Sequence, residues 1–328
     1  MTRTHSRRTR ASRTGLLLTT LVGGACSFGA AQAGVLQLAT ATNEISGVTT
    51  TSTDAVFETT SGDIARNILA SVGSQGAGGP GYFSTASAGV FGQIGLESGI
   101  TTSIGTPAVF SEVLIGSDEF VNVSGRSGTV SSRFIIDGGQ IRDFFSTDTR
   151  VTFNLQVGAT VVTAQETDPA LMENATRITA GFGSAGGFFA DYLGGGYTAI
   201  YSTDGSANAT LSTTFEGGLD LGATLDPTTG TVEIPFSLQS LELGVLGPGD
   251  RLLIGYLASF LIEVDGVTEG IVASFSDPLS LTGPALLASL EFTPDGTDNS
   301  VPLPGTLGLL LPVLVAWRRF RRCADLVR

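Results

Sequence analysis

Most of the side chains that enzymes use as nucleophiles, bases or metal ligands are missing from the middle of this 328-residue chain. Lysine does not occur at all, and three other residue types occur only within residues 1–33 or 301–328: His5, Cys26, Cys323 and Trp317. Residues 34–300 therefore cannot supply the imidazole or thiol of a Ser-His-Asp triad, a cysteine nucleophile, a disulfide or an ordinary zinc site. Without lysine, Schiff-base chemistry and a Walker P-loop are excluded as well.

Carboxylates remain the main reactive groups of this region. Residues 34–300 contain 29 acidic residues and 7 arginines, a formal charge of −22. Because this charge repels phosphate backbones, we expect no nucleic-acid partner. Two carboxylates about 5–10 Å apart across a cleft could hydrolyse a polysaccharide. No pattern fixes such a pair, since Asp118–Glu119 and the acids from Asp143 to Asp148 fit solvated loop or edge positions equally well.

Hard oxygen ligands are also what calcium prefers. The segment Asp295–Asn299 is too short for an EF-hand loop, so it indicates a weak surface ion at most. We therefore predict no catalytic residue, no metal centre and no cofactor.

Aromatic residues in a glycine-rich stretch, Gly181 to Gly196 and just beyond it, could stack on sugar rings: Phe188, Phe189, Tyr192 and Tyr197. We favour a role in filling the ends of the fold, because phenylalanine is usually a core residue and this region has no tryptophan. Three Asn-x-Ser/Thr triplets begin at Asn122, Asn174 and Asn208, and we assign them no function because such triplets arise by chance.

The elements that must position these side chains are predicted to be strands. In Arg150–Val157, the apolar Val151, Phe153, Leu155 and Val157 alternate with polar residues, which is typical of a half-buried antiparallel strand. Ser132–Ile136 and Gln140–Phe144 flank Asp137-Gly138-Gly139, a turn signal that predicts a hairpin.

Further strands are expected along the rest of the region. Thr231–Leu238 alternates too, and Pro235 places it at a sheet edge or bulge. Arg251–Val264 is the longest apolar candidate, followed by a turn at Asp265–Gly266 and a strand over Gly270–Ser276. Gly62–Val72 fits helix or strand, with strand slightly favoured. Gly73–Gly81 and Gly181–Gly196 are expected to be the loosest stretches.

The two ends of the chain have the composition of addressing signals. Five arginines precede an uncharged apolar run over 15–31, and Ala31-Gln32-Ala33 offers the small residues that a signal peptidase accepts. We expect cleavage after Ala33. The alternative is a basic amphipathic helix that the mature protein retains.

The C-terminal segment has three parts in a fixed order. Val301-Pro302-Leu303-Pro304 comes first, an apolar run to Trp317 follows, and four arginines end the pattern: Arg318, Arg319, Arg321 and Arg322. The run from 301 to 317 is uncharged and at the short end of what spans roughly 30 Å of hydrocarbon. Under the positive-inside rule the arginines would stay cytoplasmic. Because hydropathy does not distinguish a helix that is retained from one that is removed, the alternative is a permanent single-span anchor.

This tail resembles the PEP-CTERM sorting signal of exosortase-processed bacterial surface proteins, more closely its Val-Pro-Leu-Pro variant. Leu303 stands where the commonest form has Glu, Gly305 replaces the usual Ala, and Pro312 interrupts the apolar run. The resemblance covers only residues 301–328. It implies processing by an exosortase-like protease, a Gram-negative bacterium that makes exopolysaccharide, and a role in the extracellular matrix.

Together these observations predict an all-β protein with an antiparallel, jelly-roll-like β-sandwich over residues 34–293. A signal helix over 1–33 precedes it, a linker over 294–300 follows it, and the sorting tail over 301–328 carries a transmembrane segment at about 305–317. We expect a secreted or cell-surface protein without enzymatic activity, transiently held in the inner membrane. Its expected partners are signal peptidase, an exosortase-like protease and exopolysaccharide. The alternative function is a secreted polysaccharide hydrolase that uses paired carboxylates.

Overall fold

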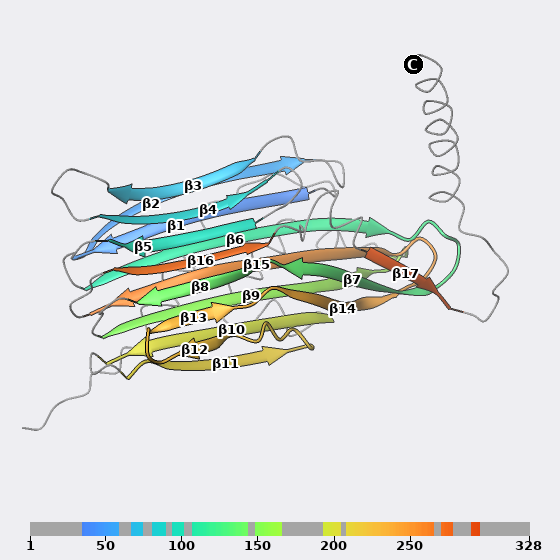
Figure 1. The fold of residues 1–328 in the computed structure, drawn as a ribbon. Helices are drawn as coiled ribbons and strands as arrows, with labels where there is room; N and C mark the ends of the chain where they lie inside the picture. The colour runs from blue at the N-terminus through green and yellow to red at the C-terminus, as the bar shows by residue number, and fades with distance from the viewer. Residues whose placement is uncertain are drawn as a thin grey trace, which may run out of the picture. The chain divides into compact units, whose positions relative to one another are not determined.

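The computed structural model of the chain describes residues 35–58, 67–74, 81–89, 94–101, 107–143, 148–165, 193–204, 208–265, 270–277 and 290–295. These residues form an all-β structure in which every strand pair is antiparallel (Figure 1). Within the same ranges, no helix is long and apolar enough to cross a membrane. The chain divides into two compact units, residues 1–294 and 295–328, and the description below concerns the first.

Sheet A contains seven strands in the order β11-β10-β9-β15-β6-β1-β2. Their bounds are β1 Val35–Ile45, β2 Val48–Glu58, β6 Ala108–Val121, β9 Thr149–Val162, β10 Leu193–Thr203, β11 Thr210–Glu216 and β15 Arg251–Val264. The late strand β15 pairs with β6 on one side and β9 on the other. The centre of the sheet is therefore completed by a segment that lies far along the chain from both of its neighbours.

Sheets B and C form the opposite layer. Sheet B has the order β12-β13-β8-β16-β5-β4-β3, and sheet C has the order β14-β7-β17. The strands of sheet B are β3 Ile68–Ser74, β4 Tyr82–Ala88, β5 Ile94–Ile100, β8 Gly138–Asp143, β12 Thr224–Asp226, β13 Thr231–Ile234 and β16 Ile271–Asp277. Those of sheet C are β7 Gly128–Ile136, β14 Ser237–Leu246 and β17 Leu290–Pro294.

One continuous core joins the layers. Strands β1 and β6 of sheet A pack on β3, β4 and β5 of sheet B, whereas β9 and β10 pack on β14 of sheet C. The ring of Phe153 on sheet A lies 5.0 Å from the ring of its sheet neighbour Phe260 and 4.6 Å from that of Phe275 on sheet B. Because aromatic rings at these distances bury large apolar areas, the contact between Phe153 and Phe275 stabilises the packing of sheet A on sheet B.

The alternation patterns predict most strands correctly. Val151, Phe153, Leu155 and Val157 are all buried on one side of β9, as expected. Strand β15 has the predicted bounds, and β16 confirms the strand expected over Gly270–Ser276. Part of the ambiguous segment Gly62–Val72 is the strand β3; residues 62–66 lie outside the described residues.

The predicted hairpin around Asp137-Gly138-Gly139 is wrong. Strand β7 pairs with β14 and β17 in sheet C, whereas β8 pairs with β13 and β16 in sheet B. The chain bends instead of reversing, and Gly138 has φ +120°. The segment that pairs with β7 and β8 is interrupted at the same level: β13 ends at Ile234 in sheet B, and β14 begins at Ser237 in sheet C. Pro235 therefore marks a change of sheet. A two-stranded ribbon thus turns a corner from one sheet to the next.

Three other segments differ from expectation at their ends. Gly73 and Ser74, at the start of the stretch Gly73–Gly81 that was expected to be loose, belong to β3. The glycines of 194–196 belong to β10, although Gly181–Gly196 was expected to be loose throughout. Strand β17 includes Pro294, the first residue of the expected linker. Residues 75–80, 181–192 and 296–300 of these predicted loops and linker lie outside the described residues.

Candidate functional site

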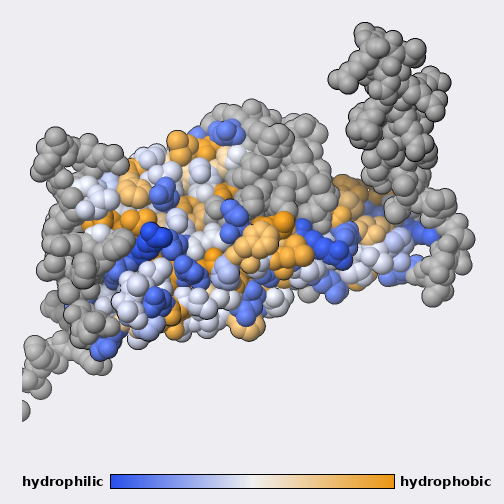
Figure 2. Space-filling view, viewed as in Figure 1, coloured by the Kyte–Doolittle hydropathy of each residue, from blue (hydrophilic) through white to orange (hydrophobic). Residues whose placement is uncertain are grey.

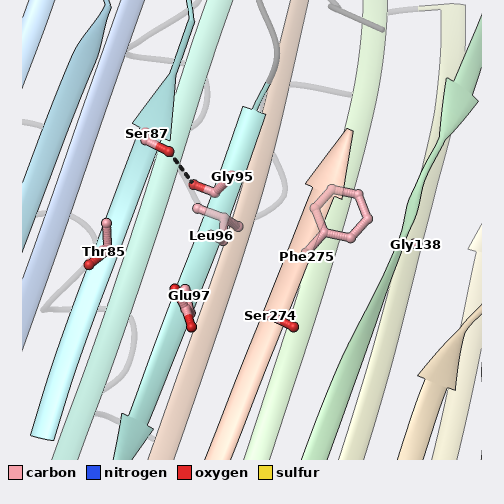
Figure 3. Close-up of a pocket in the computed structure, with 8 residues that line it drawn as sticks. All are labelled: Thr85, Ser87, Gly95, Leu96, Glu97, Gly138, Ser274 and Phe275. Carbon is pink, nitrogen blue, oxygen red and sulfur yellow. Dashed lines mark hydrogen bonds between the residues drawn. The ribbon is translucent and has the colours of Figure 1, made fainter. Parts of the chain in front are cut away.

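A shallow groove lies on the outer face of sheet B and has a volume of about 250 Å³. Figure 3 shows the contributing strands side by side, with Thr85 and Ser87 on β4, Glu97 on β5 and Ser274 on β16. Gly95 and Gly138 also line it, together with Leu96 and Phe275. We call this feature the sheet-B groove.

The groove follows from the two-residue period of the strands. Ser84, Ala86 and Ala88 of β4 face the core, so Thr85 and Ser87 face outward. The same alternation turns Gly95 and Glu97 of β5 outward. Because glycine has no side chain, Gly95 leaves a hollow between its neighbours. Its carbonyl oxygen accepts a hydrogen bond from the Ser87 hydroxyl at 3.4 Å (Figure 3).

A row of polar residues crosses the sheet through this groove. The strand registers place one polar residue of each strand directly beside the next, from β3 to β12: Ser71, Thr85, Glu97, Ser274, Gln140, Glu233 and Thr224. Within the row, the Ser71 and Thr85 hydroxyls lie 3.3 Å apart, and the Gln140 amide donates to Glu233 at 3.5 Å. We call these seven residues the polar row.

Aromatic side chains flank the row. The ring of Phe83 covers Gly99, where a Cβ atom would lie 2.8 Å from the ring. Phe236 is 64% exposed, and its backbone nitrogen lies beside Gly138 at the end of the groove. Leu238, two residues further along the chain and on β14, is 67% exposed. Figure 2 shows hydrophobic surface near the junction of β7 and β8, beside hydrophilic surface.

The arrangement can hydrogen-bond an uncharged polar ligand, because hydroxyls and amides both donate and accept. Glu97 is the one carboxylate that lines the groove among the residues described. Paired-carboxylate hydrolysis would need a second one at about 5–10 Å. Over the same part of the chain, no three His, Cys, Asp or Glu side chains gather as metal ligands would.

Several acidic residues fit solvated loop or edge positions by their sequence, but some of them are buried. Glu119 is 7% exposed, and its Oε1 lies 3.3 Å from Nη1 of Arg251. Burial raises the pKa of Glu119, and the guanidinium of Arg251 offsets part of that rise. Asp143 is also buried and accepts a hydrogen bond of 2.8 Å from the hydroxyl of Tyr201. Asp148 is exposed, as expected, whereas residues 144–147 lie outside the described residues.

Glu112 is a buried acid that sequence reasoning missed. It lies on β6, opposite Ala41 of β1 and Phe260 of β15, and is fully buried. Burial raises the pKa of Glu112 to about 8, although the hydroxyls of Ser84 and Ser98 lower it in part.

Neither carboxyl oxygen of Glu112 forms a hydrogen bond with the hydroxyl of Ser84 or Ser98. Each of these two hydroxyl groups donates its proton to another acceptor. Ser84 donates to Oδ1 of Asn43 at 2.6 Å, and Ser98 to the carbonyl oxygen of Phe83 at 3.2 Å. Position 112 alternates in step with Ala108 and Phe110, both core residues, and this phase was the one sequence signal that could have found it.

Asn122 has a structural role that its Asn-x-Ser triplet did not suggest. Its amide nitrogen donates to three carbonyl oxygens, those of Arg126, Leu246 and Gly247, and its Oδ1 accepts from Ser124. These hydrogen bonds join the loop after β6 to the β14–β15 turn. Because Asn122 is only 2% exposed, its side chain is not accessible for modification in the folded protein. Asn208 is exposed, and Asn174 lies outside the described residues.

Of the four aromatics considered for sugar stacking, Tyr197 is a core residue with 1% exposure, as favoured from the sequence. The other three, Phe188, Phe189 and Tyr192, lie outside the described residues. The same holds for all the predicted sorting residues: Ala31, Ala33, Val301, Pro302, Leu303, Pro304, Arg318, Arg319, Arg321 and Arg322.

No protein-family model matches the chain, and no curated protein matches it.

Proposed function

We propose that this chain is a secreted or cell-surface protein of a Gram-negative bacterium, without enzymatic activity, and associated with extracellular polysaccharide. Its all-β body is proposed to be a jelly-roll-like β-sandwich, flanked by a signal helix and a sorting helix. The tail over 301–328 carries the proposal, because its proline motif, apolar run and arginine cluster stand in the order that an exosortase-like protease is expected to process.

The body supports a role in binding rather than in catalysis. Residues 34–300 lack histidine, cysteine and lysine, and the sheet-B groove presents hydroxyls with a single carboxylate. The buried carboxylates are engaged in other contacts or enclosed in the core. Glu119 lies against Arg251, Asp143 accepts from Tyr201, and Glu112 faces the interior. A hydrolase with paired carboxylates remains the alternative that activity assays would test.

Intact-mass measurement on protein recovered from the culture fluid and from the cell envelope tests the sorting proposal. We expect a mass without residues 1–33 and without the arginine cluster from 318 to 322. A chain that reaches the surface with Arg318–Arg322 still attached would overturn the proposal. The matched control replaces Pro302 and Pro304 by alanine, which leaves the apolar run intact and should leave the tail uncleaved.

A further inference from the structure

We infer that the sheet-B groove and the polar row bind a single chain of a neutral polysaccharide that runs across the strands. This inference rests on the proposed association with polysaccharide and names the site and the charge class of the polymer. The observation that carries it is the register of the sheet, which aligns hydrogen-bonding side chains from seven strands on one face.

The spacing of the row suits a polymer. Neighbouring strands lie about 4.8 Å apart, so the row repeats a polar side chain at that interval over roughly 29 Å. This interval is close to the length of one pyranose residue in an extended glycan. A chain lying across the strands can therefore meet one side chain of the row with each sugar.

The size of the groove also indicates a surface ligand. Its volume of about 250 Å³ is below the roughly 300–1,000 Å³ of pockets that enclose a whole small molecule. It can hold only a short part of a ligand, while the rest lies on the exposed face. A glycan chain held at one point and continuing along the row fits this geometry.

The side chains match the chemistry of sugars. Thr85 and Ser274 can each donate to and accept from a sugar hydroxyl, while the Glu97 carboxylate accepts from two neighbouring hydroxyls. The exposed ring of Phe236 beside the groove offers an apolar surface to the C–H face of a sugar. Hydrogen bonds and an adjacent exposed ring are the two contacts that an uncharged sugar can make.

The charge of the face selects among polysaccharides. Glu97 and Glu233 are exposed in the polar row, and Arg142 is the exposed cation of the neighbouring row. With −22 formal charges over residues 34–300, the protein repels anionic polymers. The inference is therefore restricted to neutral chains.

Affinity electrophoresis in gels that contain a neutral polymer, either dextran or galactomannan, or the anionic polymer alginate, tests the inference. The buffer contains EDTA, so that divalent ions cannot bridge the protein to alginate. The full chain should be retarded by a neutral polymer and not by alginate. The double variant Thr85→Val and Glu97→Ala removes two outward groups without touching the core. Loss of the hydrogen bond of Thr85 and of the two that Glu97 accepts should weaken retardation by roughly tenfold or more. Glu242→Ala, an outward glutamate on β14, is the matched control and should migrate like the wild type.

Three results would overturn the inference. Equal retardation of the double variant and the wild type would show that the polymer binds elsewhere, and the proposed polysaccharide association would stand. Stronger retardation in alginate than in the neutral gels would contradict the charge argument. If no gel retards the wild type, and the producing bacterium's own polysaccharide does not bind it either, both the groove and the polysaccharide association fail. The intact-mass result would still decide the sorting proposal separately.

Discussion

Replacement of Glu112 by glutamine should change how the stability of the protein depends on pH. Burial raises the pKa of Glu112 from 4.5 to about 8, so the folded protein holds this proton more tightly than the unfolded chain. The side chain's contribution to stability is therefore fully present below pH 4.5 and is lost progressively as the pH rises to 8. Above pH 8 both states are ionised, and the loss reaches its limit.

The magnitude follows from the two pKa values. Each unit of difference corresponds to about 1.4 kcal/mol, so the loss is about 3 kcal/mol at pH 7 and about 5 kcal/mol above pH 8. Because Glu112 is fully buried, solvent does not screen this effect. A loss of this size is a large share of the ~5–15 kcal/mol by which domains are usually stable.

Urea denaturation at several pH values between 5 and 9 measures the effect. Since many carboxyls titrate over the acidic part of this range, the informative quantity is the difference in unfolding free energy between Glu112→Gln and the wild type. We expect this difference to move in favour of the variant by about 3 kcal/mol between pH 5 and pH 8. The amide itself can cost about 1–3 kcal/mol if its donors lack acceptors, but that cost does not depend on pH.

The reference is Glu242→Gln, which makes the same exchange at an exposed position of β14. Its difference from the wild type provides the baseline slope. If Glu112→Gln gives the same slope as Glu242→Gln, the argument that burial keeps Glu112 protonated at neutral pH is refuted. A Glu112→Leu variant that also follows the wild-type pH dependence would lead to the same conclusion.

Two further predictions concern the connections between sheets. Gly138→Ala should destabilise the protein by about 1–3 kcal/mol in thermal unfolding, because its φ is +120° and the new Cβ would lie 2.6 Å from the carbonyl oxygen of Ile234. Gly125→Ala, also at positive φ but in open space, should cost less, and equal losses would contradict the close-contact argument. Asn122→Ala should cost about 2–4 kcal/mol in urea denaturation, since it leaves buried carbonyl oxygens without their donor. Val123→Ala at a 90% exposed position is its control, and a loss no larger than that of the control would disprove this role for Asn122.

Local patterns in the sequence predict which residues form strands and which of their faces are buried. The alternation in β9 and β15 is visible in the residues themselves, because successive side chains of a strand point to opposite faces. The acidic charge and the absence of histidine, cysteine and lysine from residues 34–300 are likewise properties of the sequence alone.

The partners of the strands could not be predicted in this way. Asp137-Gly138-Gly139 has the composition of a hairpin turn, yet β7 and β8 belong to different sheets because each pairs with residues about 100 positions further along the chain. A turn signal describes only the backbone near it, whereas pairing depends on every strand that competes for the same edge.

The candidate site could not be predicted from the sequence for the same reason. Ser71, Thr85, Glu97, Ser274 and Gln140 have nothing in common in the sequence, and only the registers of sheet B bring them into one row. The packing of sheet A against sheet B similarly decides that Glu112 on β6 is enclosed while Glu97 on β5 is exposed, although both are single acids within strands. Local patterns of residues were enough to place the strands and to show which reactive groups the strands carry. Which side chains meet, and which lose contact with water, follows only from the folded arrangement, because these properties depend on contacts between residues far apart in the chain.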